Sequence, residues 1–187
     1  MNNYFVILAA GKGERFDKNK AKQFYNYKNK EIIEHSIEKS LKSKLFQKVI
    51  IVTNSTKKLK NKKYSKSVTI IKGGKERSDS SLIALKYIKK FKPENVLIHD
   101  AARPNFSIKL LKNFIKNLKK NKAVVPFVKT KDSIKYKVGN RLHNLNKKNS
   151  FLTQTPQAFR YKDLYLLANK YKNNISDEAT LFIDNNY

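Results

Sequence analysis

The sequence predicts a single α/β domain, a three-layer sandwich in which helices cover both faces of a mostly parallel sheet. Two observations favour this fold class. Short runs rich in β-branched residues, without polar alternation, are typical of strands buried on both faces. Between them, apolar residues recur at helical spacing, so strand and helix alternate along the chain. The chain has 187 residues, of which 40% are hydrophobic, so we expect one core and one domain over residues 1–187.

The expected elements follow one another in a regular order. Strands are predicted at residues 4–10, 49–53, 68–71 and 96–98. Three helices are predicted from their apolar faces, which comprise Ile33, Ile37 and Leu41, then Leu82, Leu85 and Ile88, then Leu111, Phe114, Ile115 and Leu118. Right-handed crossovers between parallel strands put a ligand site at the carboxyl ends of the strands. The loops that follow the strands are therefore the candidate site.

A different pattern over residues 132–149 predicts a projecting β-hairpin arm. Ile134, Tyr136 and Val138 alternate with polar residues, and Gly139-Asn140 supplies a two-residue turn. No predicted helix covers this apolar stripe. We therefore expect the arm to project from the domain and to pack on another subunit.

The composition excludes some classes of protein and leaves others open. Lys and Arg number 42 against 14 Asp and Glu, a net charge of +28, which suits nucleic acid, an anionic membrane surface or a phosphorylated substrate. Without cysteine there is no disulfide or thiolate site. The longest apolar run near the start is too short to span a membrane. We expect a cytoplasmic protein with no membrane partner.

The first strand runs into Ala9-Ala10-Gly11-Lys12-Gly13-Glu14-Arg15-Phe16. Gly11 and Gly13 let backbone N–H groups face an anion, and Ala9 and Ala10 leave room for a flat base. Arg15 and Lys22 would add positive charge beside a polyphosphate. Gly-x-Gly alone favours a plain strand-to-helix turn with solvated lysines. The loop is neither a P-loop nor a dinucleotide fingerprint, because the required Gly-Lys-Ser/Thr and third glycine are missing.

Two more clusters follow predicted strands. Gly73-Gly74-Lys75-Glu76-Arg77-Ser78-Asp79-Ser80 opens a helix, whose N-terminus favours an anion or a base edge, with Ser78 or Asp79 as its cap. His99-Asp100-Ala101-Ala102-Arg103-Pro104 precedes a helix that Ser107 would cap. Asp100 suits Mg²⁺ held beside substrate phosphates, or else a loop-bracing carboxylate. We expect His99 to brace this loop.

Six motifs occur together in one order and spacing. They are Leu8 to Phe16, Lys22-Gln23, Gly73-Gly74-x-x-Arg77-x-x-Ser80, His99 to Pro104, Gln154-Thr155-Pro156-Gln157 and Asp177-Glu178-Ala179. Over residues 4 to about 185 the chain resembles the 2-C-methyl-D-erythritol 4-phosphate cytidylyltransferase family of the non-mevalonate isoprenoid route. The resemblance implies a Rossmann-like nucleotidyltransferase fold and transfer of a cytidylyl group from CTP to the methylerythritol phosphate.

The resemblance also implies roles for particular residues of this sequence. Arg15 and Lys22 would be catalytic and would stabilise charge at the α-phosphorus. The residues that would bind the nucleotide are Ala9, Ala10, Gly11, Gly13, Gly74, Arg77 and Ser80. The residues that would bind the acceptor are Arg103, Ser133, Lys147, Thr155 and Ser176. Asp100 would bind Mg²⁺, and the arm of a homodimer would reach the neighbouring active site.

The sequence departs from the family pattern at a few positions. Ala21 replaces a usual proline, Ser133 and Ser176 replace threonines, and Lys147 replaces an arginine, which exchanges a bidentate fork for a point charge. The resemblance also implies a further strand and a lysine motif beyond Tyr187. Two alternatives stay open: a pentitol-phosphate cytidylyltransferase of the same family and a basic RNA-binding module. The second lacks a recognised RNA-binding motif, so we do not expect nucleic acid.

Overall fold

The centre of the computed structural model is a six-stranded sheet in the order β5-β4-β1-β6-β12-β7. The structure describes residues 2–11, 13, 16–56, 59, 64, 67–171 and 175–186. The strands are β1 (Asn3–Leu8), β4 (Lys48–Val52), β5 (Val68–Ile71), β6 (Asn95–Asp100), β7 (Ala123–Val124) and β12 (Gln157–Arg160). The first four of these are parallel, and β12 is antiparallel to both β6 and β7. The expected mostly parallel sheet is confirmed.

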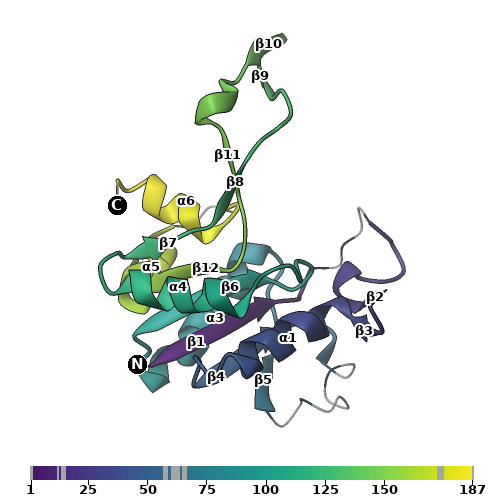
Figure 1. The fold of residues 1–187 in the computed structure, drawn as a ribbon, viewed down its shortest axis with the longest axis vertical. Coiled ribbons are helices and arrows are strands. Elements are labelled where there is room, and N and C mark those ends of the chain that lie inside the picture. Colours follow the sequence, from purple (N-terminus) through teal and green to yellow (C-terminus); the bar gives the residue numbers. More distant parts are fainter. Residues whose placement is uncertain are drawn as a thin grey trace.

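Helices cover both faces of this sheet (Figure 1). One face carries α1 (Ile32–Lys42) and α4 (Ile108–Leu118). The other face carries α3 (Arg77–Ile88), α5 (Tyr161–Lys170) and the short α6 (Glu178–Ile183). These three layers confirm the predicted sandwich. No helix in the described residues is long and apolar enough to span a membrane.

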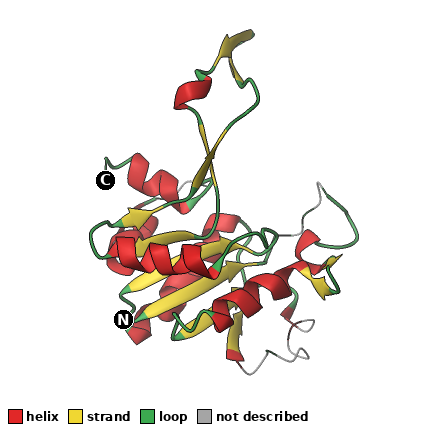
Figure 2. Cartoon of the chain, in the orientation of Figure 1, coloured by secondary structure: helices red, strands yellow, loops and turns green. Residues whose placement is uncertain are grey.

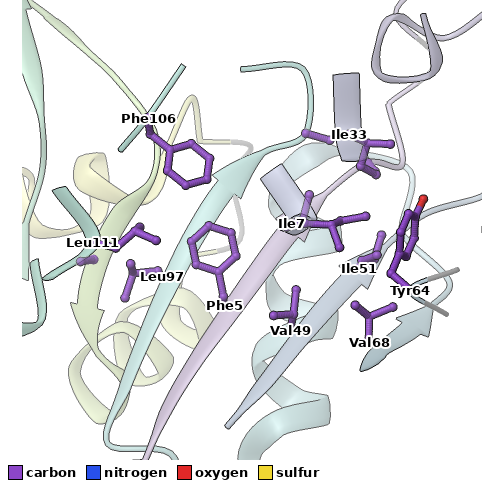
Figure 3. Packing of buried hydrophobic residues seen from close by; sticks show 14 of the residues in the cluster. Phe5, Ile7, Ile33, Val49, Ile51, Tyr64, Val68, Leu97, Phe106 and Leu111 are labelled. Carbon is purple, nitrogen blue, oxygen red and sulfur yellow. The ribbon is translucent and has the colours of Figure 1, made fainter. Parts of the chain in front are cut away.

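The central strand β1 has an almost unbroken apolar run because it packs against helices on both faces of the sheet. Phe5 and Ile7 pack beneath α1 and α4, together with Val49 and Leu97 of the neighbouring strands (Figure 3). The alternate residues Tyr4, Val6 and Leu8 face the opposite helix layer, and every residue of β1 is buried. Each such fully buried large apolar side chain contributes about 1.5 to 3 kcal/mol.

The helix N-termini show one confirmed cap and one correction. Ser107 caps α4, and its hydroxyl accepts the Leu110 N–H at 3.1 Å, as predicted. In α3 the cap is Glu76, so the expectation of Ser78 or Asp79 at that position is wrong. Asp79 is the third helical residue, and its carboxylate accepts the Glu76 N–H at 2.9 Å. It acts as the reciprocal partner in a capping box.

The arm projects from the domain as predicted, but it is longer than residues 132–149 (Figure 2). Its outer part is the hairpin of β9 (Lys135–Val138) and β10 (Arg141–Asn144), and Gly139 at the turn has φ +56°. Its stem pairs β8 (Phe127–Lys129) with β11 (Phe151–Thr153). Every residue of these four strands is exposed in the single chain, so the arm has no apolar cover of its own.

Two smaller features lie beside the sandwich. A short hairpin joins β2 (Asn26–Tyr27) and β3 (Lys30–Glu31) just before α1. Single turns of 3₁₀ helix occur at Lys22–Phe24, Lys89–Phe91 and Lys147–Asn149. The first of these turns places Lys22 next to the carboxyl end of β1.

Candidate active site

A cavity of about 350 Å³ opens where β1, β5 and β6 end. Its lining combines the loops that follow these strands with the start of α3 and the 3₁₀ turn at Lys22. All seven residues predicted to bind the nucleotide line it, and so do Lys22 and Asp100. The complete lining is Leu8, Ala9, Ala10, Gly11, Gly13, Lys22, Gln23, Gly74, Lys75, Glu76, Arg77, Ser80, Asp100, Ala101 and Ala102.

Gln23 holds the loop that follows β1 through two hydrogen bonds. This side chain is buried, and its Nε2 donates to the carbonyl oxygens of Ala9 at 2.9 Å and Gly11 at 3.0 Å. Gly13 has φ +71°, and a Cβ there would lie 3.2 Å from the backbone nitrogen of Lys22. Around Gly11, by contrast, a Cβ would meet nothing within 4 Å. The backbone at Gly11 is therefore open to a ligand, whereas Gly13 is required by conformation.

The loop after β5 needs both of its glycines because it is tightly packed. A Cβ on Gly73 would lie 2.4 Å from that of Ala10, and a Cβ on Gly74 would lie 2.3 Å from that of Asp79. The hydroxyl of Ser80 accepts the Gly74 N–H at 3.1 Å and donates to the carbonyl of Glu76 at 3.2 Å. Ser80 thereby ties this loop to the start of α3, while the close approach of Gly73 to Ala10 brings the loop against the first one.

The two residues predicted to be catalytic differ in what the structure says of them. Lys22 lines the cavity, and its Nζ lies 5.4 Å from the ring centroid of Phe16. Arg15 lies outside the described residues, between Gly13 and Phe16. The position of Lys22 suits a positive charge next to a bound triphosphate.

Two arginines hold the carboxylate of Asp100. Arg77 Nε lies 3.1 Å from Asp100 Oδ1, and Arg103 Nε lies 3.2 Å from Oδ2. The other guanidinium nitrogens of Arg77 donate to both carboxylate oxygens of Glu178 at 2.9 Å. Burial opposes the charge of Arg77, but the two carboxylates outweigh it and raise its pKa. Arg77 thus lines the cavity with its guanidinium already bound to protein.

His99 braces the Asp100 loop, as predicted, from inside the core. Its Nε2 lies 3.0 Å from Ser36 Oγ and its Nδ1 lies 3.1 Å from Thr155 Oγ1. Thr155 Oγ1 in turn accepts the backbone N–H of Asp100 at 3.2 Å. Burial, with the positive charges of Arg103 and Lys39, lowers the pKa of His99 to about 3. The ring is neutral at physiological pH and serves the architecture of the site.

A second cavity of about 490 Å³ shares Ala102 with the first. Arg103 and Thr155, both predicted to bind the acceptor, line it. Arg103 Nη1 also donates to Gln154 Oε1 at 2.9 Å. The remaining lining residues are Pro104, Asn105, Leu110, Pro126, Phe127, Val128 and Gln154. Two adjoining cavities thus separate the predicted nucleotide residues from two of the predicted acceptor residues.

The other three predicted acceptor residues line neither cavity. Ser133 and Lys147 lie on the arm, where Ser133 Oγ accepts from Lys135 Nζ at 3.0 Å and Lys147 Nζ donates to the carbonyl of Lys131. Ser176 lies just before α6, with its Oγ 3.2 Å from Thr180 Oγ1. The described part of one chain therefore does not bring all five acceptor residues together.

Sequence reasoning assigned no role to Gln23 or Glu178. Gln23 stands beside Lys22 in a recognised motif, so the available signal in the sequence was an amide next to a predicted catalytic lysine. The structure shows that this amide is buried. Glu178 is only 1% exposed and belongs to the Asp177-Glu178-Ala179 motif. A carboxylate in that motif, in a chain with five arginines, was the signal for an ion pair.

The fold and the site together define a nucleotidyltransferase. The sheet ends in a cavity that carries the backbone of two glycine loops, a lysine and a carboxylate held by arginines. The family model of 2-C-methyl-D-erythritol 4-phosphate cytidylyltransferase, IspD, matches residues 4–184. The chain belongs to this family.

The names of relatives with similar sequences agree with this family. The chain is 45% identical over 184 residues to the bifunctional enzyme IspD/IspF of Pelagibacter ubique, and the match covers 98% of this chain and 50% of that protein. It is 36% identical over 170 residues to 2-C-methyl-D-erythritol 4-phosphate cytidylyltransferase of Thermosipho melanesiensis, covering 87% of this chain and 75% of the relative. The chain thus spans half of the two-function relative and three quarters of the single-function one.

Solved structures agree with this assignment. The 4-diphosphocytidyl-2C-methyl-D-erythritol synthase of Anaerococcus prevotii has a TM-score of 0.84 and 25% identity, covering 99% of this chain and 82% of that one. The 2-C-methyl-D-erythritol 4-phosphate cytidylyltransferase of Francisella tularensis has a TM-score of 0.82 and 28% identity. The match covers 100% of this chain and 87% of that one. The predicted nucleotidyltransferase fold is confirmed.

Proposed function

We propose that this chain transfers a cytidylyl group from CTP to 2-C-methyl-D-erythritol 4-phosphate and releases pyrophosphate, in the non-mevalonate isoprenoid pathway. Membership of the cytidylyltransferase family supports the reaction. The observation that carries the proposal to this chain's own residues is the shared lining of the 350 Å³ cavity. All seven residues predicted to bind the nucleotide, which come from two separate motifs, line it together with Lys22 and Asp100 from two others.

In the proposed reaction, an oxygen of the acceptor phosphate attacks the α-phosphorus of CTP. The bond from the α-phosphorus to the bridging oxygen of the β-phosphate breaks, and pyrophosphate leaves with that electron pair. The acceptor phosphate is already an anion, so no general base or covalent intermediate is needed. Catalysis then consists of positioning and charge stabilisation.

The residues divide this work between the two cavities. In the first, the open backbone at Gly11 would face the triphosphate, and Ala9 and Ala10 would leave room for the cytosine ring. Lys22, with Arg15, would stabilise negative charge on the α-phosphoryl group. In the second cavity, Arg103 and Thr155 would bind the acceptor.

We further propose Mg²⁺ as the cofactor, with Asp100 as its one protein ligand. Among the described residues there is no cluster of three or more His, Asp or Glu side chains that could hold a metal. A site with one protein carboxylate suits Mg²⁺, because this ion is commonly bound through one or two carboxylates, substrate phosphates and water. When bound, the ion would neutralise charge on the phosphates. Asp100 lines the nucleotide cavity, as this arrangement requires.

We also propose that two copies pair through their arms in the cytoplasm, where CTP is available. The support is the exposure of apolar side chains on the arm: Tyr136 is 47% exposed, Val138 58% and Leu142 71%. Ser133 and Lys147 lie on this arm and outside the cavities of their own chain. Pairing would let them reach the acceptor site of the partner.

Phosphorus NMR tests the proposed reaction through its product. CTP, Mg²⁺ and the methylerythritol phosphate are incubated with the protein, and the three CTP signals are followed over time. We expect them to be replaced by pyrophosphate and by the coupled pair of signals of a diphosphate diester. Hydrolysis of CTP to CMP and pyrophosphate, without the coupled pair, would contradict the proposal.

A further inference from the structure

Glu178 forms an ion pair with Arg77, which lines the nucleotide cavity. It is 1% exposed and lies at the first position of α6, whereas Arg77 is the first residue of α3. Arg77 Nη1 and Nη2 donate to Glu178 Oε1 and Oε2, each at 2.9 Å. This is a bidentate pair between segments 101 residues apart in sequence.

The same arginine also contacts the predicted metal ligand. Arg77 Nε donates to Asp100 Oδ1 at 3.1 Å, while Arg103 Nε lies 3.2 Å from Asp100 Oδ2. Each oxygen of Asp100 therefore already faces a positive charge. Without a further carboxylate, two arginines would oppose a divalent cation at Asp100, because like charges repel strongly where water is partly excluded.

We infer that Glu178 is a positioning residue of this site, which binds Arg77 and balances its charge so that Asp100 can hold a divalent cation together with CTP. Two arginines then stand against two carboxylates, and the group is neutral before the cation arrives. The bidentate geometry also fixes the guanidinium plane, so that only Nε points to Asp100. The inference rests on the proposed function, since it concerns the Mg²⁺ and CTP of that reaction.

The substitution Glu178→Gln separates charge from shape, because glutamine has nearly the same volume and lacks the charge. An uncompensated Arg77 would then attract Asp100 and the triphosphate more strongly and would repel the cation. The variant should therefore bind CTP without metal at least as tightly as the parent chain. Its CTP affinity should gain about tenfold less from Mg²⁺ than that of the parent.

Calorimetry measures this directly, as the CTP dissociation constant with and without Mg²⁺. Glu38→Gln is the matched control. Glu38 lies on α1, outside both cavities, and its Oε2 pairs with Lys30 Nζ at 2.7 Å. The control should keep the parent ratio of the two dissociation constants. Glu178→Asp retains the charge and should recover most of the ratio. Urea unfolding checks that each variant is folded.

A second variant keeps the test decisive if Glu178→Gln does not fold. The double variant Arg77→Gln, Glu178→Gln removes both members of the buried pair, which proteins tolerate better than loss of one. It leaves Arg103 against Asp100. Both CTP dissociation constants should rise, because Arg77 is itself a predicted nucleotide residue, whereas their ratio should stay at the parent value. The inference is overturned if Glu178→Gln weakens CTP binding equally with and without Mg²⁺, or if the double variant loses the Mg²⁺ effect. Failure of the parent chain to bind CTP at all would instead refute the proposed function.

Discussion

The hydroxyl of Thr155 accepts the backbone N–H of Asp100 at 3.2 Å and so joins the acceptor cavity to the predicted metal ligand. The same oxygen lies 3.1 Å from Nδ1 of the buried His99. A neutral imidazole, a threonine and a strand end thus form one hydrogen-bonded unit. Both cavities depend on the geometry of this unit.

The buried His99 should make the stability of the domain depend on pH. Its pKa is about 3 in the folded chain and about 6.5 when unfolded, so below about pH 6.5 protons bind preferentially to the unfolded state. The contribution of the neutral His99 to stability is therefore fully present above about pH 6.5. It is lost as the pH falls toward 3. At pH 5 this single group should cost about 2 kcal/mol relative to pH 8.

Urea unfolding of the parent chain and His99→Asn at pH 8 and pH 5 measures this effect. Asparagine cannot take up the proton, so the variant should lose less stability between the two pH values. His143→Asn, at an exposed position on the arm, should behave as the parent chain does. The same pH dependence in His99→Asn and the parent would contradict the assignment.

Lys22→Ala should lower turnover while leaving CTP binding within a few-fold of the parent. The lysine charge is worth most where negative charge accumulates in the transition state. Loss of one such group costs roughly 3 kcal/mol, or about a hundredfold in rate. Steady-state kinetics and calorimetry measure the two effects. Lys42→Ala, at an exposed position at the end of α1, is the control. Normal turnover by Lys22→Ala would make Lys22 one solvated lysine among many.

Asp100→Asn should raise the Mg²⁺ concentration needed for half-maximal rate and lower the rate itself. The change removes the negative charge that would hold the cation, but it leaves the pair of Arg77 with Glu178 in place. The fold should therefore persist, as circular dichroism can verify. An unchanged Mg²⁺ titration would show that Asp100 is only a loop-bracing carboxylate.

The proposed pairing of two arms predicts that charge on the arm disrupts the proposed dimer. Val138→Asp with Leu142→Asp puts a charge on each face of the hairpin, because Val138 pairs with Arg141 and Leu142 pairs with Lys137. Light scattering should show a monomer for this variant. Leu166→Asp, at a 51% exposed position on α5, should stay dimeric. A dimer in both variants would place the interface elsewhere.

Much of the sandwich could be predicted because its strands are buried on both faces. The runs at β1, β4, β5 and β6 are largely apolar, which is typical of strands that have a helix layer on each side. The antiparallel β12 was not predicted. It has four residues and begins and ends with polar ones, so burial of Ala158 and Phe159 is set by the neighbouring strands and helices.

The site was predictable where motifs are local and less so where partners are distant. The two glycine loops follow β1 and β5 directly, so the sequence places them at one cavity, and Lys22 lies in the first 3₁₀ turn after β1. The partner of Arg77 is Glu178, and no spacing rule connects two residues so far apart. Ser133 and Lys147 could be placed on the arm, yet whether they meet a substrate depends on a second chain.

One departure from the family pattern among the predicted acceptor residues should lower the efficiency with which this chain uses its acceptor. Lys147 stands where the resemblance implies an arginine, so a point charge replaces a bidentate fork. Each charge-assisted hydrogen bond is worth about 1.5 to 3 kcal/mol, so losing one should weaken acceptor use roughly tenfold to a hundredfold. We therefore predict near-normal CTP binding by this chain. We also predict better acceptor use by Lys147→Arg.

Pyrophosphate release tests the central claim most directly. The parent chain and Lys147→Arg are each assayed with CTP, Mg²⁺ and one of three additions: 2-C-methyl-D-erythritol 4-phosphate, ribitol 5-phosphate or no acceptor. We predict release that depends on the methylerythritol phosphate in both, with a higher kcat/KM in Lys147→Arg. Equal kcat/KM in the two would contradict a role of position 147 in binding the acceptor. Release that is faster with ribitol 5-phosphate, or that needs no acceptor, would contradict the proposed function itself.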